Sequence, residues 1–240
     1  MNYGILILNK YPELANLCID SIKAHESTPD VPIVVVCDNH SGEDITHDVF
    51  KIGVYGPFVF SRSVNLGFNF LQEKDCFLMN DDVAIVEPNS IRQCAAIACA
   101  GPNIGILAPM VDGGVGNPYQ DANRINQLWP EDKYHLDLPG RTSMSLAVCF
   151  VAVYLKRKMI REVGPMDEDF TGYGFDDNDY CIRARRKNWR TTITRLVCVR
   201  HGTGGAEYKQ GENWNVTYQS ENRPSNIDIF RKKYGAVPVS

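Results

Sequence analysis

Four short, almost uninterrupted apolar runs constrain the fold of this chain more than any other feature. They are YGILIL at residues 3–8, IVVVC at 33–37, CFLM at 76–79 and IGILAP at 104–109. Apolar runs of this length that lack an alternating polar face are typical of strands covered on both sides. The sequence therefore predicts a parallel sheet with helices on both of its faces.

The segments between these runs have the three- to four-residue apolar spacing of amphipathic helices. The first begins at Pro12 and is predicted to place on one face Leu14, Leu17, Cys18, Ser21 and Ile22. Further helices are predicted at residues 62–73, 90–100, 156–163, 175–187 and 227–234, with another strand at 191–200. Alternating strands and helices indicate an α/β chain with a Rossmann-like, mostly parallel sheet flanked by helices, organised as a single domain.

Charge and cysteine usage exclude several classes of protein. The 240 residues contain 29 acidic and 25 basic side chains, a net charge of -4, and no long Lys/Arg block, so nucleic acid is not an expected partner. The eight cysteines are scattered and form no CxxC pair, which predicts buried thiols in a reducing compartment. The longest apolar run, Leu146–Leu155, is too short for a membrane-spanning helix, and Met1–Leu8 does not resemble a signal peptide. The expected location is the cytoplasm.

Acidic residues follow two of the predicted strands at the point where each strand ends. Asp38 follows IVVVC, and Asn80-Asp81-Asp82 follows CFLM. Ligands of open parallel sheets bind at the carboxyl ends of the strands, so acids on two adjacent strands would share one crevice. Their hard oxygen ligands suit Mg²⁺ or Mn²⁺, which could bridge to a diphosphate. Asp and Asn are also common at such turns for local backbone bonding, and that ordinary role stays open.

A third acidic cluster, Asp176-Asp177-Asn178-Asp179, follows the glycine-flanked loop Gly172–Phe175. It is a candidate source of the carboxylate base that deprotonates a sugar hydroxyl. The alternative role is structural, because acids stabilise a helix amino terminus and Asp179 can pair with Arg183.

His201 ends the next predicted strand and precedes Gly202-Thr203-Gly204-Gly205. Its imidazole could complete a metal site beside glycines that admit a phosphate. A single histidine is also commonly structural, so both readings stay open.

Taken in order, these motifs resemble the family 2 glycosyltransferases of the GT-A fold, especially the bacterial rhamnosyltransferase-like members. The similar segments are IVVVCDNHSGED, FSRSVNLG, FLMNDDV, VGPMDEDF, GFDDNDYCIRARRKNW and VRHGTGG. The resemblance covers most of the chain and weakens between Asp112 and Arg141. It implies a nucleotide-binding half at residues 1–110 and an acceptor-binding and catalytic half at 111–240.

The resemblance also assigns roles to single residues. Those expected to hold the nucleotide are Asp38, Asn39, Arg62, Asn65 and Asp81, with Asp81 on the ribose or the metal. Asp82 is the expected metal ligand, and His201 is a candidate ligand of the metal or the diphosphate. Asp177 is the first choice for the catalytic base and Asp176 the second.

Two departures from the family pattern leave alternatives open. Leu8-Asn9-Lys10-Tyr11 replaces the usual Thr or Asn, Tyr, Asn run, so the donor can be a UDP-, GDP- or dTDP-sugar. Asp176-Asp177 replaces a Glu-Asp pair, so the base can shift by one residue.

The expected function is an inverting, Mn²⁺- or Mg²⁺-dependent transfer of a hexosyl or deoxyhexosyl group from a nucleoside-diphosphate-sugar to a glycan or glycolipid hydroxyl. Residues 112–141 are expected to supply an acceptor or lid surface through Tyr119, Trp129 and Tyr134, because aromatic faces pack on sugar rings.

Three other functions are alternatives to this one. A sugar-1-phosphate nucleotidyltransferase would need a glycine-rich basic loop after Leu8, and a dinucleotide-dependent dehydrogenase would need a GxGxxG motif there; neither is present. A non-catalytic nucleotide-sugar or carbohydrate-binding module is disfavoured because both acidic clusters are retained.

Overall fold

The computed structural model describes residues 2–27, 29–38, 41–123, 147–172, 174–202 and 224–235. Its strands are β1 (Tyr3–Asn9), β2 (Ile33–Asp38), β3 (Phe50–Val54), β4 (Asp75–Asn80), β5 (Val83–Ile85), β6 (Ile104–Asp112), β7 (Ala152–Leu155) and β8 (Arg190–His201). Its helices are α1 (Pro12–His25), the short 3-10 helix η1 (Ser41–Asp44), α2 (Phe60–Leu71), α3 (Ser90–Ala100), α5 (Arg157–Val163), α6 (Asp176–Arg186) and α9 (Asn226–Tyr234).

All the described strands belong to one sheet, in the order β3-β2-β1-β4-β7-β6-β8-β5. Strands β3, β2, β1 and β4 are parallel to one another, and β6 is parallel to β8. Strand β7 is antiparallel to β4 and β6, and β5 is antiparallel to β8. The predicted class, a mostly parallel α/β sheet flanked by helices, is confirmed.

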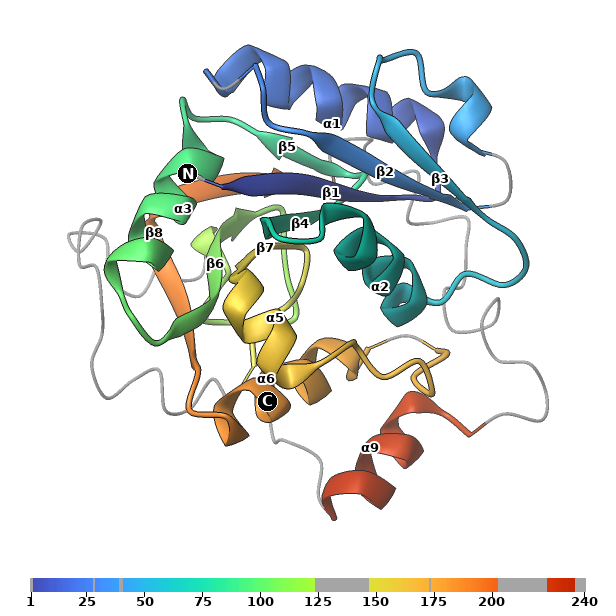
Figure 1. Ribbon diagram of the computed structural model, residues 1–240, viewed down its shortest axis with the longest axis vertical. Helices are drawn as coiled ribbons and strands as arrows, with labels where there is room; N and C mark the ends of the chain where they lie inside the picture. Colours follow the sequence, from blue (N-terminus) through green and yellow to red (C-terminus); the bar gives the residue numbers. More distant parts are fainter. Residues whose placement is uncertain are drawn as a thin grey trace.

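The helices form a layer on each face of the sheet (Figure 1), and β1 shows why. Tyr3, Ile5 and Ile7 pack with α1 and α3 on one face, whereas Leu6 and Leu8 pack with α2, α5 and α6 on the other. Because side chains alternate along a strand, a strand covered on both faces must be apolar at every position. The YGILIL run is therefore a requirement of the central position of β1.

The strand order corrects one prediction. Strands β2 and β4, which end in Asp38 and in Asp81-Asp82, are not adjacent, because β1 lies between them and pairs with both. The three strands are parallel, so their carboxyl ends still lie at one edge of the sheet, but the end of β1 separates the two acidic positions. Pairing order depends on long-range contacts that an apolar pattern does not encode.

Three strands were missed. Strand β3 (FKIGV) is at a sheet edge and mostly exposed, so it has no continuous apolar run, and β5 is only three residues long. Strand β7 lies within the apolar run Leu146–Leu155, to which no strand was assigned.

Two predicted burials are also wrong. Leu17 is 52% exposed on the outer side of α1, and Cys99 is exposed near the end of α3. The eight cysteines are free thiols, of which Cys18, Cys37, Cys76, Cys94 and Cys181 are buried. No helix among the described residues is long and apolar enough to cross a membrane.

A close contact between α2 and β1 yields a stability test. A Cβ atom at Gly67 would lie 2.2 Å from Cδ2 and 2.8 Å from Cγ of the buried Leu6. Although alanine favours helices by about 1 kcal/mol relative to glycine, overpacking a core costs about 1–3 kcal/mol. We therefore expect Gly67→Ala to lower the free energy of unfolding in urea. Asn69→Ala, on the exposed side of the same helix, is the control, and a Gly67→Ala protein more stable than the wild type would contradict the packing argument.

Candidate active site

The edge of the sheet at which the parallel strands end, here called the carboxyl edge, contains residues from both parallel and antiparallel strands. β6 and β8 run in the same sense as β4, so Asp112 and His201 end at this edge together with Asp38 and Asn80. Strand β7 runs in the opposite sense and begins there. The site described below is built on this edge.

Asp81 joins the end of β4 to the end of β1. Its Oδ2 accepts hydrogen bonds from the backbone N–H groups of Lys10 and Tyr11, each at 2.8 Å, and its own N–H donates to the carbonyl of Leu8 at 3.2 Å. Burial raises the pKa of Asp81 to about 6, although the two backbone N–H bonds favour the ionised form. Asp81 therefore has a structural role at the β1–α1 turn, and a contact with ribose or metal stays a prediction.

Asp82 and His201 lie face to face, as a shared metal site would require. The Nε2 atom of His201 is 3.3 Å from Oδ2 of Asp82, and both side chains are largely buried. The backbone carbonyl of Asp82 accepts from the N–H of Gly202 at 2.9 Å, next to the antiparallel pairing of Val83 with His201. Two residues 119 positions apart in the sequence are thus held together by the pairing of β5 with β8.

A contact with the backbone of Gly114 fixes the orientation of the His201 ring. Its Nδ1 lies 2.9 Å from the carbonyl oxygen of Gly114, and a carbonyl can only accept, so Nδ1 carries the proton. In the neutral ring the lone pair is then on Nε2, on the side of Asp82, which is the tautomer that binds a metal through Nε2.

Gly113 and Gly114 make this contact possible. Both have positive φ angles, +112° and +87°, and a Cβ at Gly113 would lie 2.0 Å from the carbonyl oxygen of His201. Only glycine fits where β6 ends so close to β8. Strand β8 also carries a bulge opposite Pro109 and Met110, where its paired residues jump from Thr194 to Cys198. Bulges bend a strand, and this one lies where β8 turns toward β5.

The acidic pair Asp176-Asp177 opens α6. Gly174 and Phe175, with φ of +79° and +69°, turn the chain into the helix. A positive φ is uncommon for a bulky residue and costs on the order of 1–3 kcal/mol, so Phe175 must be held by its surroundings. Asp176 accepts from the N–H of Asp177 at 3.0 Å and Asp177 from that of Asn178 at 2.7 Å, so the pair caps the helix amino terminus.

Burial raises the pKa of both carboxyl groups, and repulsion from Asp177 raises that of Asp176 further. Two carboxylates this close resist simultaneous ionisation. A carboxyl group with a raised pKa is a better proton acceptor once it is ionised, which suits a general base.

The segment before β7 connects the acidic pair to β4. The backbone N–H of Phe150 bonds to Asp177, and the carbonyl of Val151 accepts from the N–H of Asn80 at 3.0 Å. The neighbouring residues Phe150 and Val151 therefore connect the Asp177 carboxylate to the end of β4, which Asp81 and Asp82 follow.

Two residues that the sequence analysis did not single out hold this segment. The fully buried Gln120 pairs with both backbone groups of Cys149, donating at 3.2 Å and accepting at 3.0 Å, and Asn117 donates to the carbonyl of Ala147 at 2.8 Å. Polar side chains in a stretch rich in Gly, Pro and Asn give no signal that they are buried. These bonds hold residues 117–120 against the segment before β7. The acceptor-surface role of Tyr119 stays a prediction, and Trp129 and Tyr134 lie outside the described residues.

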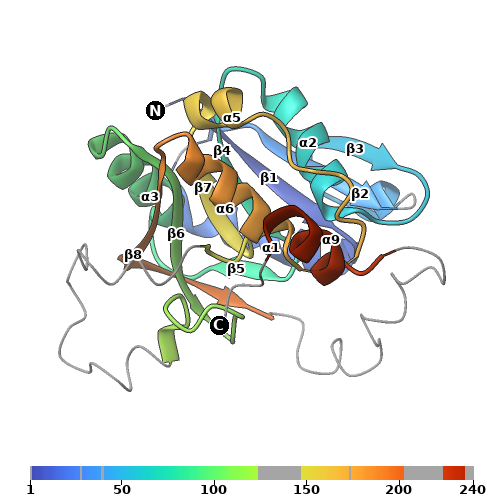
Figure 2. The ribbon, with the colours of Figure 1, turned by 90° about the horizontal axis from the view of Figure 1, so that it is seen from below.

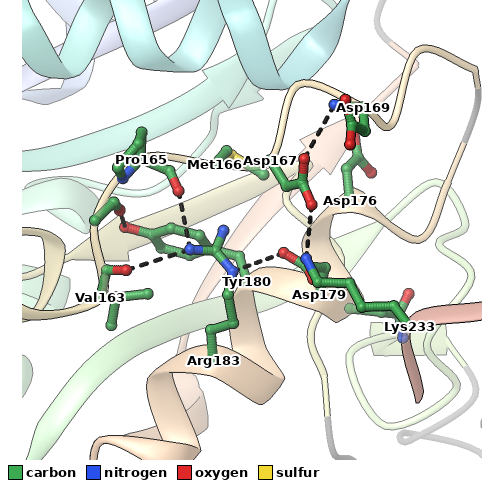
Figure 3. Close-up of polar contacts among 12 residues, drawn as sticks. Val163, Pro165, Met166, Asp167, Asp169, Asp176, Asp179, Tyr180, Arg183 and Lys233 are labelled. Atoms are coloured by element: carbon green, nitrogen blue, oxygen red, sulfur yellow. Dashed lines mark hydrogen bonds and ion pairs between the residues drawn. The ribbon is translucent and has the colours of Figure 1, made fainter. Parts of the chain in front are cut away.

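A network of charges supports α6 one turn beyond the acidic pair (Figure 3). The buried carboxylate of Asp179 receives Arg183 at 2.7 Å, as predicted, and also Lys233 and Tyr234 of α9 at 2.6 Å each. Arg183 further donates to the carbonyls of Val163 and Pro165, and Lys233 reaches Asp167 at 2.6 Å. A buried carboxylate needs such partners.

The remaining residues predicted to contact the nucleotide make no described contact with Asp82, His201, Asp176 or Asp177. Asp38 ends β2, and Arg62, on α2, donates to the carbonyl of Pro57 at 2.5 Å. Asn65 uses its amide for bonds to the backbone of Met166 and to Glu168, which clamp α2 to the 165–170 segment. Asn39 lies outside the described residues. Contact of these four residues with a nucleotide stays a prediction.

The raised carboxyl pKa values make stability depend on pH. The folded chain keeps protons on Asp176 and Asp177 that the unfolded chain releases near pH 4, so their burial costs stability as pH rises from about 4 through the folded pKa values. Asp176→Asn keeps the oxygen that accepts from Asp177 and removes the ionisation. We expect it to stabilise the protein by about 1–2 kcal/mol more at pH 8.5 than at pH 4.5 in urea unfolding. Asp177→Asn should change stability in the same direction by a smaller amount. If Asp176→Asn changed the free energy of unfolding equally at both pH values, the raised pKa assigned to Asp176 would be wrong.

Several solved structures have a similar fold. No protein-family model and no curated protein sequence matches the chain. The mannosyltransferase PcManGT from Pyrobaculum calidifontis, in complex with GDP-Man and Mn²⁺, is similar with a TM-score of 0.62 at 12% identity over 84% of this chain and 56% of its own. GalNAc-T7 with UDP, GalNAc and Mn²⁺ is similar with a TM-score of 0.61 at 10% identity, over 84% of this chain and 44% of its own. Residues 1–349 of S. aureus TarS are similar with a TM-score of 0.59 at 12% identity, over 87% of this chain and 63% of their own. The chain thus spans less than two thirds of each matched protein, and the likeness confirms the GT-A fold that the sequence analysis predicts.

Proposed function

We propose that this chain is an inverting, metal-dependent glycosyltransferase that moves a sugar from a nucleoside-diphosphate donor to a hydroxyl of a glycan or glycolipid. The observation that supports it most is the pairing of Asp82 with His201 at the same sheet edge as the acidic pair Asp176-Asp177. A metal-type ligand pair and a carboxylate base are the two elements that a direct displacement at a sugar carbon needs.

The ligand pair fits a divalent cation. A carboxylate oxygen and an imidazole nitrogen face one another at 3.3 Å, with the ring oriented by its contact with Gly114, and both are ligands that Mn²⁺ accepts. No cluster of three or more ligating side chains occurs among the described residues. In our proposal, Asp82 and His201 would hold Mn²⁺ or Mg²⁺ beside the diphosphate of the donor. When bound, the cation would offset the charge of the departing nucleoside diphosphate.

Asp177 is the proposed base and Asp176 its neighbour. Asp177 is less buried than Asp176, which suits contact with an acceptor hydroxyl. In the proposed step, Asp177 takes the hydroxyl proton, the acceptor oxygen attacks the anomeric carbon, and the bond to the diphosphate breaks. Attack from the face opposite the leaving group inverts that carbon, and Asp176, kept neutral by its raised pKa, spares Asp177 a second charge.

The donor class is supported by the complexes of proteins with the same fold. PcManGT is described with GDP-Man and Mn²⁺, and GalNAc-T7 with UDP, GalNAc and Mn²⁺. We propose a UDP-, GDP- or dTDP-sugar with a hexosyl or deoxyhexosyl group, bound by residues 1–110, with the acceptor bound by 111–240. Membership of family 2 near the rhamnosyltransferase-like proteins and a cytoplasmic location belong to the same proposal.

Donor binding tests the metal site. We expect one nucleotide class from a panel of UDP-, GDP- and dTDP-sugars to raise the melting temperature of the wild type only with Mn²⁺, and Asp82→Ala or His201→Ala to abolish the rise. His47 and Asp20 form a matched control, because their 3.3 Å contact has the same chemistry at a distant surface. If His47→Ala removed the Mn²⁺-dependent shift equally, or His201→Ala kept it, the site would be misassigned.

Turnover tests the base. Asp177→Asn should lower kcat by about 10²–10⁴-fold because general base catalysis is lost, with donor binding retained. Asp169→Asn, which changes an exposed carboxylate nearby, should leave kcat unchanged. Proton NMR of the first product reports the anomeric configuration. A retained configuration would refute the single displacement, and donor binding without transfer or hydrolysis would indicate a binding module.

A further inference from the structure

The amino-terminal residue of α9, Asn226, grips the loop that precedes the acidic pair. Its side chain is 3% exposed, its Oδ1 accepts from the N–H of Gly172 at 2.9 Å, and its Nδ2 donates to the carbonyl of Gly174 at 2.6 Å. One side-chain amide thus satisfies two backbone groups of a single loop, as a neighbouring strand would.

The loop is shaped to receive this side chain. A Cβ at Gly172 would lie 3.2 Å from Oδ1 of Asn226, so a larger residue there would push the amide away. Gly174 and Phe175 follow with positive φ angles, and Asp176 and Asp177 come next. The direction of both carboxylates therefore depends on how this turn is held.

Two further contacts place α9 against the turn. The ring of Phe230 lies 5.2 Å from that of Phe175, and Lys233 and Tyr234 bond to the buried Asp179. Both ribbon views show α9 beside α6 (Figures 1 and 2). The helix therefore contacts the chain before the acidic pair and also one turn after it.

Asn226 is not needed to form α9 itself. Ser225 caps the helix by accepting from the N–H of Asp228, and Gly235 ends it with a positive φ of +77°. Alanine is well tolerated in a first helical turn. The buried amide of Asn226 is thus devoted to the loop.

We propose that Asn226 is a positioning residue that sets the orientation of Asp176 and Asp177 through Gly172 and Gly174. This inference rests on the proposed function only where it concerns turnover. Misplacing a reacting group by about 1 Å can cost on the order of 10²-fold in rate. Loss of the amide should therefore lower kcat and spare donor binding, because the Asp82–His201 pair does not touch α9 in any described contact.

Two variants test the hold on the loop: Asn226→Ala loses both bonds, and Asn226→Asp keeps the acceptor for Gly172 but loses the donor to Gly174. Lys232→Ala, on the exposed side of α9, is the control. Hydrogen–deuterium exchange of residues 172–180 measures the hold on the loop without any substrate. We expect faster exchange there in Asn226→Ala, with exchange in β1 and β4 unchanged, and an intermediate effect in Asn226→Asp.

In steady-state kinetics with Mn²⁺ and the donor identified by the panel, Asn226→Ala should lower kcat by about 10–100-fold, with the donor KM within about threefold of the wild type and Asn226→Asp in between. Unchanged exchange and kcat would overturn the proposal. So would a joint loss of kcat, donor binding and melting temperature in both variants, which would mark a general packing role. A wild type inactive on every donor would reject the proposed function, and the exchange measurement would still decide the positional claim.

Discussion

The two hydrogen bonds from Lys10 and Tyr11 to the carboxylate of Asp81 are the interaction on which the site depends most. β1 lies inside the parallel part of the sheet, pairs with β2 and β4, and is buried on both faces. At its end the chain must turn into α1, and the turn exposes backbone N–H groups. Asp81 satisfies two of them and so ties the loop after β1 to the loop after β4, where Asp82 follows.

The antiparallel direction of β7 and β5 makes two other contacts of the site possible. A purely parallel sheet would start every strand at the far edge, away from the ligand. Because β7 is antiparallel, Phe150 enters at the carboxyl edge and can bond to Asp177. Because β5 is antiparallel to β8, the residue before it, Asp82, meets His201. Residues far apart in sequence are thereby joined by backbone pairing, which is more rigid than contact between side chains alone.

Strands that are buried on both faces can be predicted from the sequence, because each is a continuous apolar run. Exposed strands and the order in which strands pair cannot be predicted in this way. β1, β2, β4 and β6 are recognisable because two-sided burial requires an apolar residue at each position. β3, whose side chains are largely exposed, has no such signature. In the site, the carboxylates are visible as strand-end motifs. The amides that hold the backbone, Gln120 and Asn226, are not, because a single polar residue carries no pattern that reveals its partner.

The support for the acidic pair comes from the part of the described chain that is synthesised last. Every strand among the described residues lies before residue 202, whereas the partners of Asp179 on α9 are Lys233 and Tyr234. As a chain leaves the ribosome from its amino terminus, the strands that carry Asp82 and His201 can pair while Asp179 still lacks these partners. The pairing of β5 with β8, which brings Asp82 to His201, can thus form before α9 supplies its contacts to Asp179 and to the loop that precedes Asp176.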